Sequence, residues 1–159
     1  MYKRMVAIEG EETGKNCNMK KNKHDFKRRI EDMGNEEIKR QQEKVKRLKM
    51  PEIRTIDFLY DEGGEVTYEY AELTALCPMT GIQDIYTVKI TFVPEKKIPE
   101  LKSLREYFLA YRDVPILHEH LANKIFKDFN GAVRANKIKI QLNVAIRGGI
   151  TTTVVIEKG

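Results

Sequence analysis

The chain has 159 residues, 41% of them hydrophobic, which gives room for one ordinary domain with a modest core and excludes a large enzyme with separate substrate and cofactor domains. No stretch reaches the roughly 18 consecutive apolar residues that a membrane helix needs, and the first residues, MYKRMVAIEGEETG, lack the apolar centre of a signal peptide. These patterns predict a soluble, cytoplasmic protein without a membrane partner.

The net charge of +5 is concentrated in the first 50 residues. They hold 15 of the 29 Lys and Arg residues but only 9 of the 24 Asp and Glu residues, which leaves 14 basic and 15 acidic residues for the rest of the chain. Because residues 1–50 are also poor in aromatic and β-branched residues, we expect a charged, flexible or partly helical arm, with a helix that Asn35 could cap. Such an arm is either an electrostatic handle for nucleic acid or a solvated leader.

Residues 51–159 form the predicted domain, and its strands are visible as alternating patterns. Strand-like segments 52–60 and 65–73 flank a turn at 61–64, and apolar residues alternate with polar ones in 85–93, from Tyr86 to Phe92. The alternation is cleanest in 137–146, where apolar side chains from Ile138 to Ile146 face one way. A turn at 147–149 leads into a last strand.

Two amphipathic helices are predicted between these pairs of strands. The first, in ELKSLREYFLAYRD, has a stripe made by Leu101, Leu104, Phe108 and Tyr111. The second starts near Pro115, repeats apolar residues every four positions from Leu117 to Phe129, and ends at Asn130-Gly131. The order β-β-α-α-β-β predicts an α+β fold with an antiparallel sheet and both helices on one face.

The stretch TALCPMTGIQD contains the most reactive candidate, Cys77. The chain's other cysteine, Cys17, lies far away in sequence, and no Cys or His spacing suits zinc, so we expect a free thiol. As a thiolate, Cys77 could act as a nucleophile, and Asp84 could supply or accept a proton. The alternative is a small buried residue followed by a turn-capping carboxylate.

Two further groups could bind a ligand. On a helix, the histidines of His118-Glu119-His120 point away from each other, so we expect no metal site there. Glu119 could accept two hydrogen bonds from the N–H edge of a guanine-like ring, or merely favour the helix start. Lys102 and Arg105 share one helical face, which suits either a phosphate-bearing ligand or solvent.

Four motifs, LCPMTGIQD, ELKSLREYF, LHE and RGGI, together resemble the 7-cyano-7-deazaguanine reductases, which are NADPH-dependent nitrile reductases of queuosine biosynthesis and members of the tunnelling-fold superfamily. The resemblance covers about residues 65–150. It implies a tunnelling fold that assembles into an oligomeric barrel, that is, a homo-oligomer with active sites between subunits.

The resemblance also implies a mechanism. Cys77 would attack the nitrile carbon to form a thioimide, Asp84 would donate the proton, and NADPH would reduce the adduct to the aminomethyl product. The substrate would contact Pro99, Glu100, Leu101, His118 and Glu119. The residues implied for NADPH are Lys102, Ser103, Arg105 and Arg147, and no metal is implied.

Two alternatives remain open. Archaeal relatives use no NADPH and add ammonia to the nitrile within tRNA, which forms the amidine of archaeosine. The basic arm suits a tRNA partner, whereas the ELKSLREYF segment favours the reductase, although Arg105 stands where the family commonly has Lys. A third possibility is a non-catalytic domain that binds a purine-like base or a protein and does not depend on Cys77.

Overall fold

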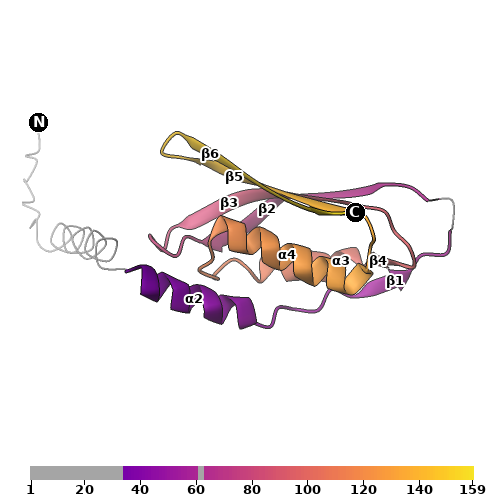
Figure 1. Ribbon diagram of the computed structural model, residues 1–159, viewed down its shortest axis with the longest axis horizontal. Coiled ribbons are helices and arrows are strands. Elements are labelled where there is room, and N and C mark those ends of the chain that lie inside the picture. The colour runs from indigo at the N-terminus through magenta and orange to yellow at the C-terminus, as the bar shows by residue number, and fades with distance from the viewer. Residues whose placement is uncertain (1–33, 61–62) are drawn as a thin grey trace, which may run out of the picture. The chain divides into compact units, whose positions relative to one another are not determined.

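The computed structural model describes residues 34–60 and 63–159 (Figure 1). These residues belong to one compact unit that begins at Gly34. In chain order the elements are α2 (Asn35–Arg47), β1 (Thr55–Asp57), β2 (Val66–Leu76), β3 (Gln83–Phe92), β4 (Lys97–Pro99), α3 (Leu101–Leu109), α4 (His118–Val133), β5 (Ile138–Arg147) and β6 (Ile150–Lys158). No helix within this part of the chain is long and apolar enough to cross a membrane.

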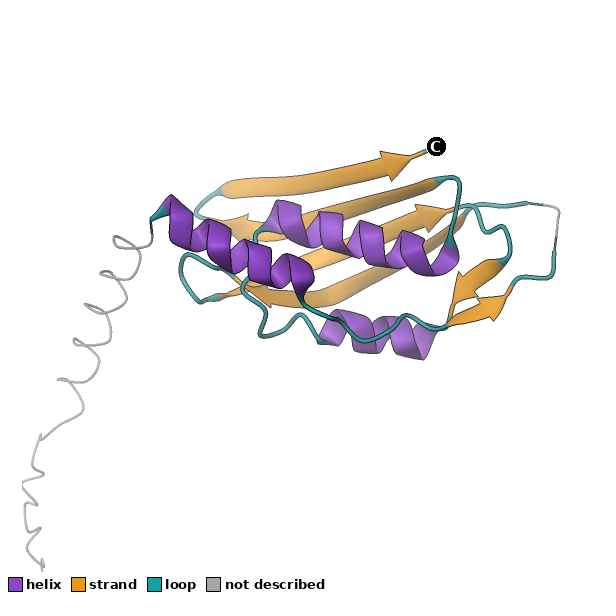
Figure 2. Cartoon of the chain, turned by 60° about the horizontal axis from the view of Figure 1, so that its bottom comes forward, coloured by secondary structure: helices purple, strands orange, loops and turns teal. Residues whose placement is uncertain are grey.

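Four antiparallel strands form the main sheet, in the order β2-β3-β5-β6. With α3 and α4 between β3 and β5 in the chain, this arrangement confirms the predicted β-β-α-α-β-β order. Figure 2 shows both helices on the same face of the sheet, where α4 contacts β5 and β6 and α3 contacts β2. The other face of the sheet is not covered by these helices.

The core lies between the sheet and the two helices. Every second residue of β3 from Asp84 to Phe92 is buried, because alternate side chains of a strand point to one face. The same alternation buries β5 residues from Ile138 to Val144, which meet the apolar stripe of α4. Asp84, with an exposed fraction of 1%, therefore stands at the end of an otherwise apolar buried row.

Two predictions about the buried faces are wrong. Ile146 is 70% exposed, because the register of β5 against β6 shifts after Val144 and the tip of this hairpin extends past the core. Leu101 is 60% exposed as well, since it is the first residue of α3. The buried face of α3 consists instead of Ser103, Leu104, Tyr107 and Phe108.

The limits of α4 also differ from the prediction. The helix begins at His118, after Pro115 has formed an isolated parallel bridge with Leu76. It continues through Asn130-Gly131 and ends at Val133, which is buried against the core. A residue in the left-handed conformation, Arg134 (φ 58°), ends it. Burial of the last turn thus outweighs the stop signal in the sequence.

The predicted strand 52–60 is much shorter in the structure and does not join the main sheet. Its strand part, β1, pairs antiparallel with β4 in a separate two-stranded sheet. Two hydrogen bonds of Arg54, the residue before β1, hold the start of α3. Glu100 N–H donates to Arg54 O at 2.8 Å, and Arg54 N–H donates to Ser103 Oγ at 3.0 Å. This small sheet therefore fixes where the first long helix begins.

The helix expected within residues 35–50 forms as α2, and the compact unit includes it, so the unit begins before the expected boundary at residue 51. Its Gln42 is buried and makes three hydrogen bonds: Nε2 donates to Pro115 O at 3.1 Å, and Oε1 accepts from Leu117 N at 3.1 Å and pairs with His120 Nδ1 at 3.0 Å. Residues 1–33 of the expected arm, including Cys17, lie outside the described residues.

We predict that Gln42→Ala lowers the free energy of unfolding by about 1–3 kcal/mol, because it leaves the partly buried Pro115 carbonyl and Leu117 N–H without partners. Urea unfolding of the full chain measures this. Glu43→Ala, an exposed position next to it on α2, is the control and should change stability by less than about 0.5 kcal/mol. Equal stability of the two variants would contradict the prediction.

Candidate active site

Cys77 sits in a tight turn between β2 and β3. Its N–H donates to Ile82 O and its carbonyl accepts from Gly81 N–H, both at 2.8 Å. Gly81 has a φ of 66°, which an L side chain adopts only with strain, so the turn depends on glycine there. The thiol is free and the residue is partly buried. The backbone therefore holds a reduced cysteine in one defined place.

Asp84 lies at the same end of the β2-β3 pair, because it pairs with Ala75, two residues before Cys77. Its side chain is fully buried and forms an ion pair with Arg147 Nη1 from the end of β5. Its second oxygen, Oδ2, has no hydrogen-bond partner in the described part of the chain. Arg147, expected to contact a cofactor, is thus engaged with the candidate acid in this chain.

Tyr86 joins the cluster, although the sequence reasoning assigned it only to the core. It lies two residues after Asp84 on the same buried face of β3, and its hydroxyl is 3.0 Å from His118 Nδ1. Burial raises the pKa of Tyr86 far above its ordinary value, and the charges of Asp84 and Cys77 raise it further. The period of two along β3 was the signal that could have linked Tyr86 to Asp84.

The start of α4 comes to the Cys77 turn through backbone hydrogen bonds. Leu76 N–H donates to Val114 O at 3.0 Å, and Ile116 N–H donates to Leu76 O at 3.1 Å. His118 therefore lies beside the end of β2, with its ring packed edge-on against Tyr86. The side chain of Glu119 is exposed and takes part in no ion pair among the described residues, so it is available to a ligand.

The segment before α3 is held in place by hydrogen bonds within the chain. Glu100 is the N-cap: its carboxylate accepts from Lys102 N–H at 2.8 Å and Ser103 N–H at 2.9 Å. These bonds, that from Ser103 first, and the Arg54 charge lower the pKa of Glu100 below its usual value. Pro99 is buried in β4, and Ser103 Oγ donates to Glu100 O at 2.8 Å, so this segment is tightly held.

Lys102 and Arg105 are both exposed on α3 and form no ion pair within the described part of the chain. Their charges and the helix start suit the phosphates of a dinucleotide. Ser103, by contrast, is 1% exposed and already hydrogen-bonded. Of the four residues expected to hold NADPH, Lys102 and Arg105 are thus free to bind it in a single chain, whereas Ser103 and Arg147 are engaged within the chain.

The two halves of the expected site lie at opposite ends of the sheet. Asp84 and the Cys77 turn are at the start of β3, whereas β4 and the start of α3 follow its end at Phe92. Eight residue steps along a strand span about 26 Å. The structure therefore brings Cys77, Asp84, His118 and Arg147 together but does not bring Lys102 to them in one chain.

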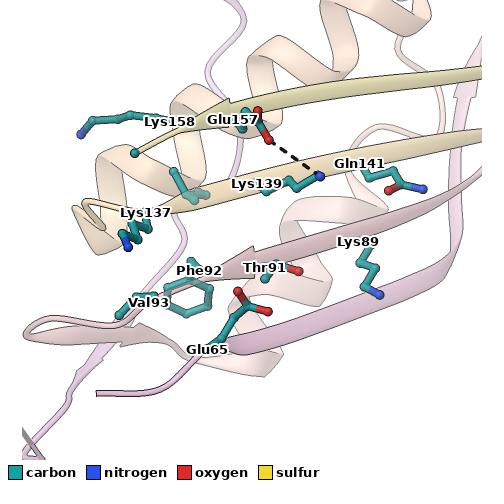
Figure 3. Close-up of a pocket in the computed structure, with 12 residues that line it drawn as sticks. Glu65, Lys89, Thr91, Phe92, Val93, Lys137, Lys139, Gln141, Glu157 and Lys158 are labelled. Atoms are coloured by element: carbon teal, nitrogen blue, oxygen red, sulfur yellow. Dashed lines mark ion pairs between the residues drawn. The ribbon is translucent and has the colours of Figure 1, made fainter. Parts of the chain in front are cut away.

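A shallow groove on the uncovered face of the sheet contains none of the expected site residues. Figure 3 shows it, with Lys89 and Lys139 from neighbouring strands and the ion pair between Lys139 and Glu157 at 3.7 Å. Among the described residues, no three His, Cys, Asp or Glu side chains gather closely enough to hold a metal ion. The candidate site is therefore the Cys77 cluster.

The fold and the cluster define an α+β protein with a cysteine beside a buried carboxylate. In fold it resembles the apo crystal structure of the archaeosine synthase QueF-Like, with a TM-score of 0.55 at 21% identity over 64% of this chain and 97% of that one. The sequence profile of the family described as QueF-like protein matches residues 84–159.

Relatives of assigned function match a larger share of the chain. The chain is 36% identical over 107 residues to the NADPH-dependent 7-cyano-7-deazaguanine reductase of Elusimicrobium minutum, spanning 67% of this chain and 81% of that protein. It is 42% identical over 92 residues to the reductase of the same name from Syntrophus aciditrophicus, spanning 58% of this chain and 66% of that protein. The chain belongs to the 7-cyano-7-deazaguanine reductase family.

We predict that Arg147→Met lowers the free energy of unfolding by about 1–3 kcal/mol at neutral pH, because it leaves the buried Asp84 carboxylate without its counter-charge. The loss should be smaller than for a fully buried pair, since the Arg147 side chain is 37% exposed. Urea unfolding measures it, and adding Asp84→Asn should recover part of the loss.

Lys139→Met is the matched control on the same strand, because it breaks the exposed Lys139–Glu157 pair. Such a pair contributes about 0–1 kcal/mol. If Arg147→Met costs no more than this control, Asp84 does not depend on Arg147 for its burial.

Proposed function

We propose that this protein reduces the nitrile of 7-cyano-7-deazaguanine to an aminomethyl group, with NADPH as reductant and a covalent thioimide at Cys77. The observation that carries the proposal is the free Cys77 thiol, held in a tight turn at the same end of β2 and β3 as the buried Asp84. The names of the relatives give the substrate and the cofactor. A nitrile suits this pair, because it needs a soft nucleophile at carbon and a proton at nitrogen.

The covalent step is the addition of the Cys77 S–H across the C≡N bond. Paired with Arg147, Asp84 is a carboxylate that can accept the thiol proton. The sulfur then forms a bond to the nitrile carbon while one C–N π bond breaks, and Asp84 returns the proton to the nitrogen. The proton is conserved, so this step needs no further reactant.

The base would be held at the start of α4. The exposed carboxylate of Glu119 can accept two hydrogen bonds from the N–H edge of the deazaguanine ring. His118, beside the same turn, would contact the ring with the nitrogen that does not face Tyr86. Glu119 and His118 thus orient the base so that its nitrile reaches Cys77.

Lys102 and Arg105 would hold NADPH, which supplies hydride when bound. Their exposed side chains fit its phosphates, and the capped start of α3 fixes where they stand. The hydroxyl of Ser103 is engaged inside the chain, so its part is to hold α3 in place. Glu100, as N-cap, has the same role, while the exposed Leu101 beside it is free to contact the substrate.

A second copy of the chain would complete the site. The Cys77 turn lies at the start of β3, whereas β4 and α3 follow its end, and these two ends of β3 are about 26 Å apart, too far for one small base to bridge within one chain. Among the described residues, no strand pairs with the outer edges of β2 and β6, so both edges of the main sheet are open to pairing with a second copy. A homo-oligomer in which α3 of one copy faces the Cys77 turn of another meets both requirements.

The second candidate is the amidine-forming reaction on tRNA. The fold neighbour named archaeosine synthase and the excess of basic residues in the first 50 positions favour it. Because this reaction needs no NADPH, the two candidates are distinguished by whether NADPH reduces the covalent adduct or ammonia adds to it. The free cationic pair on α3 and the names of the more similar relatives favour the reductase.

We predict that purified protein mixed with 7-cyano-7-deazaguanine oxidises NADPH steadily, and that Cys77→Ala abolishes this oxidation because no thioimide forms. NADPH absorbance and intact mass are the measurements. A covalent adduct without NADPH oxidation would support the amidine-forming candidate. Unchanged ligand binding and physiological function in Cys77→Ala would support a binding domain.

We predict that two inactive variants complement each other when they are co-expressed. Cys77→Ala lacks the nucleophile, and Lys102→Ala with Arg105→Ala lacks the phosphate contacts, so mixed assemblies contain some sites with both halves intact. Random assembly should restore NADPH oxidation to about a quarter of the wild-type level. In the control co-expression, Lys127→Ala, which neutralises an exposed lysine of α4, takes the place of the double variant of Lys102 and Arg105. No recovery would mean that both halves come from one chain.

A further inference from the structure

The helix α4, whose first turn carries His118 and Glu119, has no side-chain cap of its own. Its N-cap residue is Leu117, which has an extended backbone and an apolar side chain that accepts no hydrogen bond. The other helix on this face of the sheet, α3, is capped by its own Glu100. The start of α4 therefore depends on a hydrogen-bond partner from elsewhere in the chain.

That partner is the side chain of Gln42, which lies on α2, 75 positions before Leu117 (Figure 1). Two backbone groups fix its orientation. Pro115 has no N–H, so its carbonyl must face the Nε2 amine, at 3.1 Å, which turns Oε1 toward Leu117 N–H, also at 3.1 Å. Because Oε1 only accepts, His120 Nδ1, at 3.0 Å, is the donor of the third bond. One buried amide thus joins the segment before α4 to the first turn of the helix.

This arrangement is a capping box made by two helices. In a capping box within one helix, the Glu or Gln side chain at the third helical position accepts from the N–H of the N-cap residue. In α4 that third position is His120, which donates instead, and the carbonyl of Gln42 accepts from Leu117 N–H in its place. Helix α2 thus supplies a capping group that the sequence of α4 lacks.

We propose that Gln42 is a positioning residue for the substrate: by capping α4 from α2, it sets where His118 and Glu119 stand and hence how tightly the base is bound. This inference rests on the proposed function, in which those two side chains hold the base. Gln42 acts through the first turn of α4 and takes no part in the transfer of hydride or of the thiol proton. The part of the chain that forms the substrate site then includes α2, which precedes the residues 84–159 that match the family profile.

The test is a split between the kinetic constants. Gln42→Ala should raise the KM for 7-cyano-7-deazaguanine about three- to tenfold, because the lost hydrogen bonds no longer order the first turn of α4. The KM for NADPH and the kcat should stay unchanged, since Gln42 holds neither the cationic pair of α3 nor the Cys77 thiol. Steady-state NADPH oxidation below the unfolding temperature measures all three constants. A bond that only stabilises the fold would lower the amount of active protein and hence kcat, with both KM values unchanged, and that pattern would overturn the proposal.

Two further variants isolate the carbonyl of Gln42. Gln42→Glu keeps an oxygen that accepts from Leu117 N–H and His120 Nδ1–H and loses only the bond to Pro115 O, so it should restore most of the affinity for the base. Gln41→Ala is the matched control, because the buried Oε1 of Gln41 has no partner in the described part of the chain. It should leave both KM values at the wild-type level. Equal KM values for the base in the variants of Gln41 and Gln42 would contradict a role for this particular amide.

Hydrogen exchange of the Leu117 N–H separates this inference from the proposed function. Exchange should be faster in Gln42→Ala, because the N–H loses its acceptor, and should stay slow in Gln42→Glu and Gln41→Ala. If the wild type does not oxidise NADPH, the proposed function fails, while the exchange rates still decide whether Gln42 caps α4. Unchanged exchange in Gln42→Ala would overturn the inference itself.

Discussion

The segment from Val114 to Leu117 is held from two sides, and the candidate site depends on it. On one side its backbone hydrogen-bonds to Leu76, the last residue of β2. On the other side Gln42 binds Pro115 O and Leu117 N–H. Because α4 begins directly after this segment, the same bonds decide where His118 and Glu119 stand relative to the Cys77 turn. Without these hydrogen bonds, the Cys77 turn and the start of α4 would belong to independent loops.

The sequence predicted the parts of this arrangement that follow from local periodicity. Alternation along β3 predicted the buried face that carries Tyr86, and the same alternation extends to Asp84. The order of strands and helices followed from patterns of the same kind. In contrast, the sequence did not predict that Arg147 pairs with Asp84 or that Gln42 holds the segment before α4. These contacts join residues 63 and 73 positions apart, and no periodicity encodes them.

The buried carboxylate explains why several polar groups gather at one end of an apolar core. A charge removed from water needs a counter-charge and hydrogen-bond donors. Arg147 supplies the first from β5, whereas Asp84 Oδ2 has no hydrogen-bond donor in the described part of the chain. An apolar residue would pack there at lower cost, so the burial of Asp84 is unfavourable for stability, and this is why we treat it as a candidate functional group.

At the start of α3, by contrast, the buried and capping polar groups are fully used within the chain. Glu100 accepts two backbone N–H groups and pairs with Arg54, and the hydroxyl of Ser103 bonds to Glu100 O, so these polar side chains are used within the chain. What remains exposed is the cationic pair of Lys102 and Arg105. A segment fixed this firmly, yet placed far from the Cys77 turn of its own chain, is suited to present charge to a ligand held by a neighbouring copy. In the homo-oligomer that we propose, the firmly held start of α3 and the Cys77 turn of a neighbouring copy would form one shared site.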